Sequence, residues 1–179
     1  METRTDLTAF AAKIGEVRKR IADIVVGQTE AVDMLLTCII ADGHVLLEGV
    51  PGVAKTLLAR LMSRLIDARF SRIQFTPDLM PSDVLGTSVF NMKTQEFSFH
   101  PGPAFADIIL ADEINRAPAK TQAALFEVME ERQATIDGTS YKMGDVYTII
   151  ATQNPIEQEG TYRLPEAQLS LRLCATAMG

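Results

Sequence analysis

Short aliphatic runs alternate along this sequence with stretches of helical periodicity, and that alternation limits the folds available to it. Three of the runs are apolar along nearly their whole length: His44–Glu48, Ile108–Ala111 and Tyr147–Thr152. A strand that is apolar on both faces must be buried on both, which is typical of a parallel sheet covered by helices on either side. A length of 179 residues suffices for one such domain. We therefore predict a three-layer α/β/α fold around a parallel sheet.

The segments around these runs supply the remaining predicted elements. Apolar residues recur every three or four positions in four segments, which predicts helices, and alternate with polar residues in a fifth, which predicts a strand. The predicted helices are 1–23, 29–41, 55–66 and 118–131, and the predicted strand is 69–76. We expect Thr29 to cap the second helix and basic residues 18–20 to lie on a solvated face. We divide the chain into an N-terminal helix, residues 1–23, and a core, residues 24–179.

Two segments interrupt the alternation of strand and helix. In residues 86–103, two short runs, Val89–Met92 and Glu96–Phe99, flank the polar stretch 93–95. In residues 133–141, two short runs flank Asp137–Gly138, a dipeptide that strongly favours a tight hairpin turn. A plain doubly wound domain needs neither segment, so we predict two inserted β-hairpins.

Composition excludes several classes of protein. The net charge is −6, whereas a dedicated nucleic-acid binder usually shows a basic stripe. Cys38 and Cys174 are too few for a secreted disulfide scaffold, so we expect buried or free thiols in a reducing compartment. The N-terminal residues lack the features of a signal peptide, and no apolar run approaches the ~18 residues of a membrane span. These observations predict a soluble, cytoplasmic protein.

The octapeptide GVPGVAKT lies between a predicted buried strand and a predicted helix, the setting that a phosphate-binding loop requires. Backbone N–H groups at the start of such a helix point at the phosphates. Lys55 would supply positive charge to the β- and γ-phosphates, and Thr56 a hydroxyl to Mg²⁺. Because Ala54 stands where the usual pattern has glycine, the octapeptide alone also fits a glycine-rich turn with a chance Lys-Thr pair. The predicted cofactor-binding residues here are Gly49, Val50, Pro51, Gly52, Val53, Ala54, Lys55, Thr56 and Leu57.

Two consecutive carboxylates end the apolar run IILADE. Placing carboxylates at the end of a buried strand costs free energy unless they have a functional role there. Open α/β sheets bind ligands at this carboxyl edge. Asp112 would hold Mg²⁺, directly or through water, and Glu113 would orient and polarise an attacking water as a general base. The alternative is that the pair only caps a following helix, but a phosphate loop upstream favours the functional interpretation.

The third apolar run, in TIIATQNP, also ends in polar residues. If its strand neighbours Ile108–Ala111, Asn154 would meet the γ-phosphate and hydrogen-bond both water and a phosphate oxygen. An Asn-Pro turn after a strand is common, and this is the alternative. The agreement of three motifs at sensible spacing favours a catalytic role for Glu113, Lys55 and Asn154.

These motifs resemble those of the AAA+ ATPase superfamily, and specifically of its MoxR family. The similarity includes GVPGVAKT, LADEINRAPAKTQAALFEVMEERQ and ATQNPIEQEGTYRLPEAQL, and it covers residues 24–169. It implies that Val26, Gly27 and Gln28 lie on the adenine side of ATP. It further implies that 49–56 is Walker A, 112–113 Walker B, and Asn154 sensor 1. In such proteins the two hairpins project from a homo-oligomeric ring and couple hydrolysis to a partner.

The C-terminal part departs from this family. The family's LPEAQL continues into Asp-Arg-Phe, whose arginine resembles a finger reaching the neighbouring subunit. Here Arg172 comes one residue late, and Arg163 stands where the family usually has proline. A helical lid would follow, whereas this chain ends at Gly179. The resemblance therefore implies a C-terminally truncated core without its lid, and the tail SLRLCATAMG could supply the last strand of the sheet.

Taken together, the sequence predicts a core that binds ATP and Mg²⁺ and hydrolyses ATP. The resemblance implies a chaperone-like role in maturing or assembling protein complexes, with an unknown client. One alternative is an interaction module that binds nucleotide without turnover. Another is a nucleic-acid motor on the same core, but the hairpins offer only Lys93, His100 and Lys142, so nucleic acid is an unfavoured partner.

Overall fold

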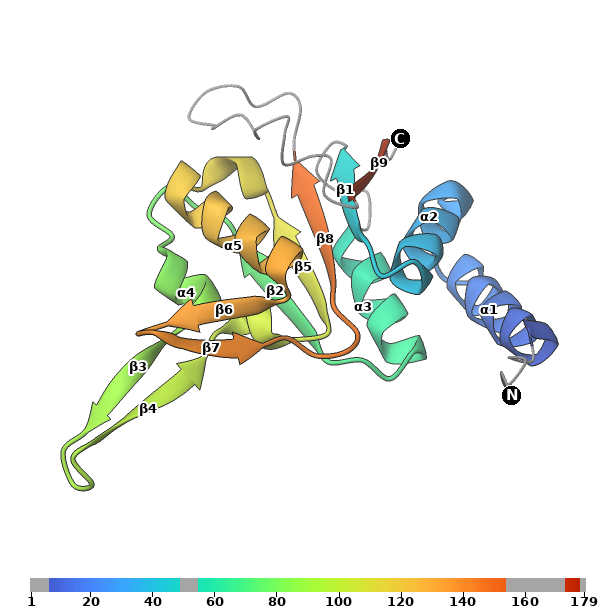
Figure 1. The fold of residues 1–179 in the computed structure, drawn as a ribbon. Helices are drawn as coiled ribbons and strands as arrows, with labels where there is room; N and C mark the ends of the chain where they lie inside the picture. The colour runs from blue at the N-terminus through green and yellow to red at the C-terminus, as the bar shows by residue number, and fades with distance from the viewer. Residues whose placement is uncertain (1–6, 49–54, 154–172, 178–179) are drawn as a thin grey trace.

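A five-stranded parallel sheet forms the centre of the molecule in a computed structural model that describes residues 7–48, 55–153 and 173–177 (Figure 1). Its strand order is β2-β5-β8-β1-β9, and every neighbouring pair is parallel. The strands are β1 His44–Glu48, β2 Phe70–Gln74, β5 Ile108–Asp112, β8 Thr148–Gln153 and β9 Leu173–Ala177. The parallel sheet predicted from the apolar runs is confirmed, and the C-terminal tail does supply a further strand.

Buried side chains of the inner strands alternate between the two faces of the sheet. In β1, Val45 and Leu47 belong to one buried cluster and Leu46 to the other. The same alternation in β5 sends Ile108 and Leu110 to one side and Ile109 to the other. Both faces therefore need a covering layer, which is why these strands are apolar along nearly their whole length.

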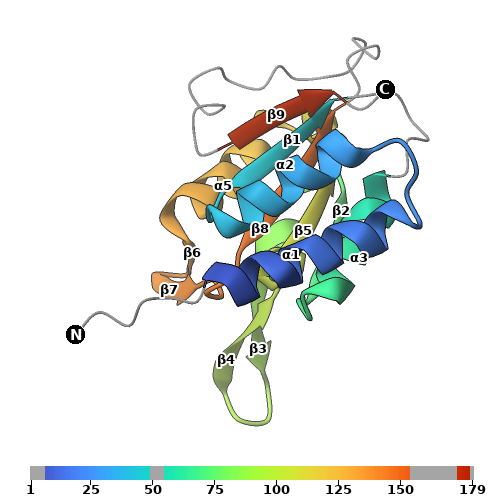
Figure 2. The ribbon, with the colours of Figure 1, turned by 90° about the vertical axis from the view of Figure 1, so that its right-hand side faces the viewer.

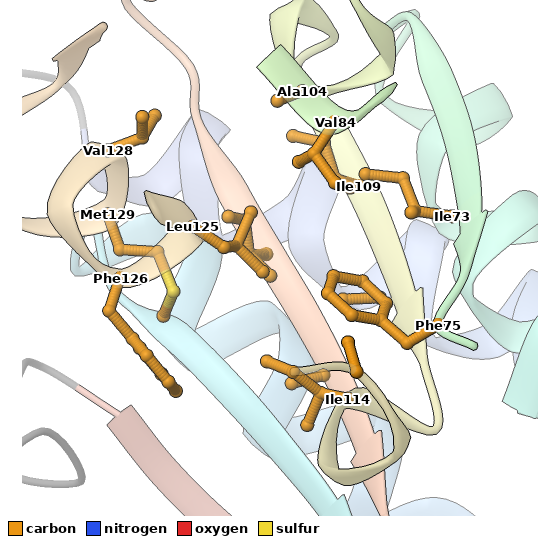
Figure 3. Packing of buried hydrophobic residues seen from close by; sticks show 14 of the residues in the cluster. Ile73, Phe75, Val84, Ala104, Ile109, Ile114, Leu125, Phe126, Val128 and Met129 are labelled. Atoms are coloured by element: carbon orange, nitrogen blue, oxygen red, sulfur yellow. The ribbon is translucent and has the colours of Figure 1, made fainter. Parts of the chain in front are cut away.

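Helices cover the two faces (Figures 1 and 2). One layer contains α1 Leu7–Ala22, α2 Thr29–Ile40 and α3 Lys55–Leu65, and the other contains the short α4 Pro81–Leu85 and α5 Ala119–Glu131. Two 3₁₀ turns, η1 Pro103–Phe105 and η2 Ile114–Arg116, precede and follow β5. Figure 3 shows α5 contributing Leu125 and Met129 to the cluster that faces Ile109 of the sheet. The three-layer α/β/α prediction is confirmed.

The N-terminal helix packs mainly through its second half. Ile21 is fully buried, whereas Leu7 and Phe10 are exposed despite their helical spacing. The prediction that Thr29 caps α2 is wrong, because Gln28 occupies that position. Gly27, with φ at +81°, turns the chain one residue earlier than expected, and the Gln28 carbonyl accepts the bond from the N–H of Val32. Thr29 is thus already inside the helix.

Both predicted hairpins are present. They consist of β3 Gly86–Asn91 with β4 Glu96–Pro101, and β6 Gln133–Ile136 with β7 Thr139–Lys142. Asp137 and Gly138 both have positive φ, as the tight turn between β6 and β7 requires. Phe99 stacks on Tyr141 with ring centroids 4.0 Å apart, which ties the two hairpins together. Figures 1 and 2 show the β3–β4 hairpin projecting from the body of the molecule.

The two cysteines are free thiols, as expected, but the fold brings them together. Cys38 is buried in α2, and Cys174 is exposed on β9, where it pairs in register with Val45 of β1. Burial, followed by hydrogen bonding to Cys174, raises the pKa of the Cys38 thiol to about 12. Sequence spacing gave no sign of this contact. Among the described residues, no helix combines the length and apolar character needed to span a membrane.

Candidate functional site

Polar side chains gather where the parallel strands end. Glu48 ends β1 and lies in register with Gln153 at the end of β8. The Gln153 side-chain amide donates a hydrogen bond to the Glu48 carboxylate. In the same sheet, Asp112 ends β5 and lies in register with Gln74 of β2. The carboxyl edge of the sheet, where open α/β folds bind ligands, is therefore polar at β2, β5, β8 and β1.

Asp112 is held at both of its carboxylate oxygens. Oδ1 accepts a hydrogen bond of 2.6 Å from the Thr152 hydroxyl, and Oδ2 forms an ion pair of 2.6 Å with the Arg72 guanidinium. Thr152 is itself buried and accepts a 2.9 Å bond from the backbone N–H of Glu113. One hydroxyl of β8 thus fixes Asp112, the last residue of β5, and Glu113, which follows it, relative to the neighbouring strand.

Glu113 adopts an unusual backbone conformation for a residue with a side chain. Its φ and ψ are 56° and 48°, the left-handed region, which non-glycine residues seldom occupy outside constrained sites. The carboxylate accepts bonds from the Gln74 amide at 3.0 Å and the Arg116 guanidinium at 2.9 Å. Glu113 precedes η2 but makes no side-chain capping bond to it. The observed geometry gives no support to the helix-capping alternative for Glu113.

Lys55 lies within electrostatic reach of both acids. It is the first described residue of α3, and it is partly buried. Burial lowers the pKa of its amine, while the charges of Asp112 and Glu113 act in the opposite direction. Thr56 follows it and is also partly buried, whereas Leu57 is exposed. The structure thus brings Lys55 close to the adjacent acids Asp112 and Glu113, which lie far from it in the sequence.

The other predicted site residues are placed as follows. Val26, Gly27 and Gln28 form the connection between α1 and α2, with Val26 strongly exposed. A hollow of about 260 Å³ lies beside this connection, but Val26, Gly27 and Gln28 do not line it. Its lining residues are Gly15, Arg18, Lys19, Ala22, Val25, Thr29 and Val32. The remaining predictions, Gly49, Val50, Pro51, Gly52, Val53, Ala54 and Asn154, together with Arg163 and Arg172, lie outside the described residues.

The residues at this edge fit a magnesium nucleotide in chemical character. Mg²⁺ prefers hard oxygen ligands, which the Asp112 carboxylate and the Thr56 hydroxyl offer. Phosphate groups prefer cationic side chains and helix amino ends, which Lys55 and α3 offer. Sequence reasoning missed Thr152, Arg72, Gln74 and Arg116 as partners of the acids. The position of Arg72 and Gln74 two residues apart on one strand was the only available signal, because it places both on one face.

Comparison with known proteins agrees with this fold and site. Residues 44–173 match the family model of ATPases associated with various cellular activities (AAA). The chain therefore belongs to the AAA family of ATPases. Within that family it groups with the MoxR proteins, as the motifs predicted, because it is 50% identical to Chaperone MoxR1 of Mycobacterium tuberculosis over 162 residues.

Other relatives agree. The chain is 51% identical over 166 residues to the uncharacterized protein YeaC of Bacillus subtilis, an alignment that covers 93% of this chain and 52% of YeaC. The MoxR1 alignment covers 89% of this chain and 43% of MoxR1. A solved structure from Cytophaga hutchinsonii, assigned as an ATPase, superposes with a TM-score of 0.79 and 45% identity over 97% of this chain and 55% of its own. The chain thus spans about half the length of the curated relatives it matches.

Proposed function

We propose that this chain binds ATP with Mg²⁺ and hydrolyses the bond to the γ-phosphate, as the motor core of a MoxR-type ring. The observation that carries the proposal is the convergence of Lys55, Asp112 and Glu113 at the carboxyl edge of the sheet. These three residues supply the phosphate-binding cation, the metal-binding carboxylate and the general base that phosphoryl transfer to water requires.

The proposed roles follow from position. Lys55 binds the β- and γ-phosphates at the start of α3, and we assign residues 49–54, which lie outside the described residues, to the same phosphates. Asp112 and Thr56 hold Mg²⁺, which neutralises phosphate charge when bound. Glu113 accepts a proton from the attacking water, and Asn154 orients that water. Val26, Gly27 and Gln28 contact the adenine.

Glu113→Gln tests this assignment. The amide keeps the size of the side chain but cannot accept a proton, so nucleotide binding persists while steady-state phosphate release falls by about 100-fold or more. Glu127→Gln, on an exposed position of α5, is the matched control and keeps wild-type turnover. Wild-type phosphate release by Glu113→Gln would place the base elsewhere. Binding of labelled ATP by the wild-type chain with background phosphate release would instead support the interaction module without turnover.

The partner we propose is a protein rather than a nucleic acid. The projecting β3–β4 hairpin exposes Met92 at 85% and Phe97 at 74% of their surface, and Phe97 packs against Phe90 with centroids 5.0 Å apart. Basic residues on it are few, so it lacks the charge that phosphate backbones require. The name of Chaperone MoxR1 supports a chaperone-like role in maturing or assembling a protein complex, with the chain acting in a homo-oligomeric ring. Salt-dependent binding of single-stranded DNA by the hairpin would favour the nucleic-acid alternative.

A further inference from the structure

Arg72 of β2 binds the acid that we propose as the magnesium ligand. Its guanidinium forms an ion pair of 2.6 Å with Asp112 Oδ2, while Oδ1 is held by Thr152. A cation at this oxygen repels a second cation approaching the same carboxylate. Arg72 is therefore the counter-ion of Asp112 in this structure.

The same guanidinium also sets the orientation of the neighbouring amide. Arg72 donates a bond of 3.0 Å to Gln74 Oε1, so the oxygen end of that amide faces the arginine. An amide has one acceptor end and one donor end, and the donor end of Gln74 consequently faces Glu113, at 3.0 Å. Arg72 thus acts on both acidic residues, directly on Asp112 and through Gln74 on Glu113.

Arg72 can also leave without a large penalty. Its side chain is 45% exposed, whereas that of Asp112 is 18% exposed, and β2 is an edge strand of the sheet. A guanidinium that already contacts solvent can turn outward and remain hydrated. Asp112 would then need a replacement cation, since a largely buried carboxylate without a partner is costly.

We propose that Arg72 is a positioning residue that neutralises Asp112 until Mg²⁺ arrives with the nucleotide and displaces the guanidinium. The proposal rests on the proposed function, because it takes Asp112 as a magnesium ligand. Arg72 would set the Mg²⁺ concentration that nucleotide binding needs, and it would keep the two acids in place before the nucleotide binds.

A purely structural role is the competing explanation, and the chain offers a matched control for it. Arg69 and Asp107 form an ion pair of 2.6 Å immediately before the same two strands, at the end remote from the acidic pair. It matches Arg72–Asp112 in its shortest distance, and it likewise joins the β2 segment to the β5 segment, although Arg69 makes more bonds to its carboxylate than Arg72 does. Arg69→Gln therefore removes a comparable interstrand ion pair without altering the charge at the carboxyl edge.

The experiment measures binding of a fluorescent ATP analogue, mant-ATP, to the full chain as Mg²⁺ is titrated. Arg72→Gln is expected to lower the half-saturating Mg²⁺ concentration by about threefold or more, because Mg²⁺ no longer displaces a cation. Arg72→Lys keeps the charge, and its half-saturating Mg²⁺ concentration is expected to lie between those of wild type and Arg72→Gln. Arg69→Gln is expected to match wild type. Thermal melting of each variant verifies that it is folded.

Two results would overturn the inference but not the proposed function. In the first, the wild-type chain needs Mg²⁺ to bind mant-ATP, but the Mg²⁺ midpoint of Arg72→Gln is unchanged or raised. In the second, Arg72→Gln and Arg69→Gln shift the midpoint equally. Failure of the wild-type chain to bind mant-ATP at any Mg²⁺ concentration would overturn the proposed function, and this inference with it. If Arg72→Gln does not fold, Arg72→Met, which also removes the charge, takes its place, and a midpoint that does not fall in that variant contradicts displacement of a bound cation.

Discussion

At the scale of single residues, the acidic pair depends on side chains to which the sequence motifs assigned no role. Thr152 is buried in β8, yet its hydroxyl forms hydrogen bonds with the Asp112 carboxylate and the backbone N–H of Glu113. Glu113 holds a left-handed backbone that costs of order 1–2 kcal/mol. The bonds from Thr152, Gln74 and Arg116 offset that cost by holding the residue in place.

Thr152→Val measures what the hydroxyl contributes. Valine has nearly the same shape, so the change removes two hydrogen bonds and leaves the Glu113 N–H without its partner. We expect a loss of about 1–3 kcal/mol in the free energy of unfolding, measured by urea denaturation. Thr152→Ser keeps the hydroxyl and, as the matched control, retains both bonds. A Thr152→Val chain as stable as wild type would show that the two bonds contribute little.

At the scale of elements, backbone geometry decides how the β3–β4 hairpin joins the body. Gly86 has φ at +98°, and a Cβ there would lie 2.2 Å from the His100 carbonyl oxygen. Gly102 is equally tight, because a Cβ there would meet the backbone N of Gly86 at 2.5 Å. Both ends of the hairpin therefore require glycine, and the strands can approach closely where they leave the core.

Gly86→Ala and Gly15→Ala should change stability in opposite directions. The first forces a methyl group into backbone atoms at a positive φ, and we expect a loss of at least about 2 kcal/mol. The second adds a methyl in the middle of α1, where the new Cβ would meet nothing beyond its own stretch of helix within 4 Å, and we expect a gain of up to about 1 kcal/mol. Urea denaturation of both variants is the measurement. A neutral Gly86→Ala would mean that the base of the hairpin rearranges freely.

At the scale of the whole molecule, parallel strands bring distant parts of the chain to one edge. Lys55 follows β1, Asp112 ends β5, and residues after 153 follow β8, so ligand binding at this edge would join three segments. A ligand that binds only the folded chain stabilises it by mass action. Binding at the edge should therefore raise the stability of the entire fold and not only of the site.

Lys55→Ala tests this linkage. At a Mg·ATP concentration 100-fold above its Kd, the wild-type chain should gain about 2.7 kcal/mol of stability, seen as a rise in Tm. Lys55→Ala should show no such rise, because the phosphates lose their cation. Lys120→Ala removes a lysine from the first turn of α5 and should respond as wild type does. An unchanged thermal shift in Lys55→Ala would remove Lys55 from the binding site.

The elements and the type of fold could be read from the sequence. Apolar runs predicted β1, β5 and β8, because a strand that is buried on both faces needs apolar residues along its length. The Asp137–Gly138 pair predicted the β6–β7 hairpin, because few residue types accept the positive φ of its turn. Motif spacing also predicted that Lys55, Asp112 and Glu113 would converge. The predicted cap of α2, Thr29, was one residue too late, because the positive φ of Gly27 turns the chain into the helix earlier than the sequence pattern indicated.

Only the tertiary structure decided which side chains hold the acidic pair. Arg72 and Gln74 reach Asp112 and Glu113 because β2 lies beside β5, and Thr152 reaches them because β8 lies on its other side. The approach of Cys38 to Cys174 likewise depends on β9 pairing with β1. Local periodicity determines whether a segment becomes a strand, but strand order arises from packing between segments far apart in the chain. Contacts made across strands were therefore beyond the reach of sequence pattern alone.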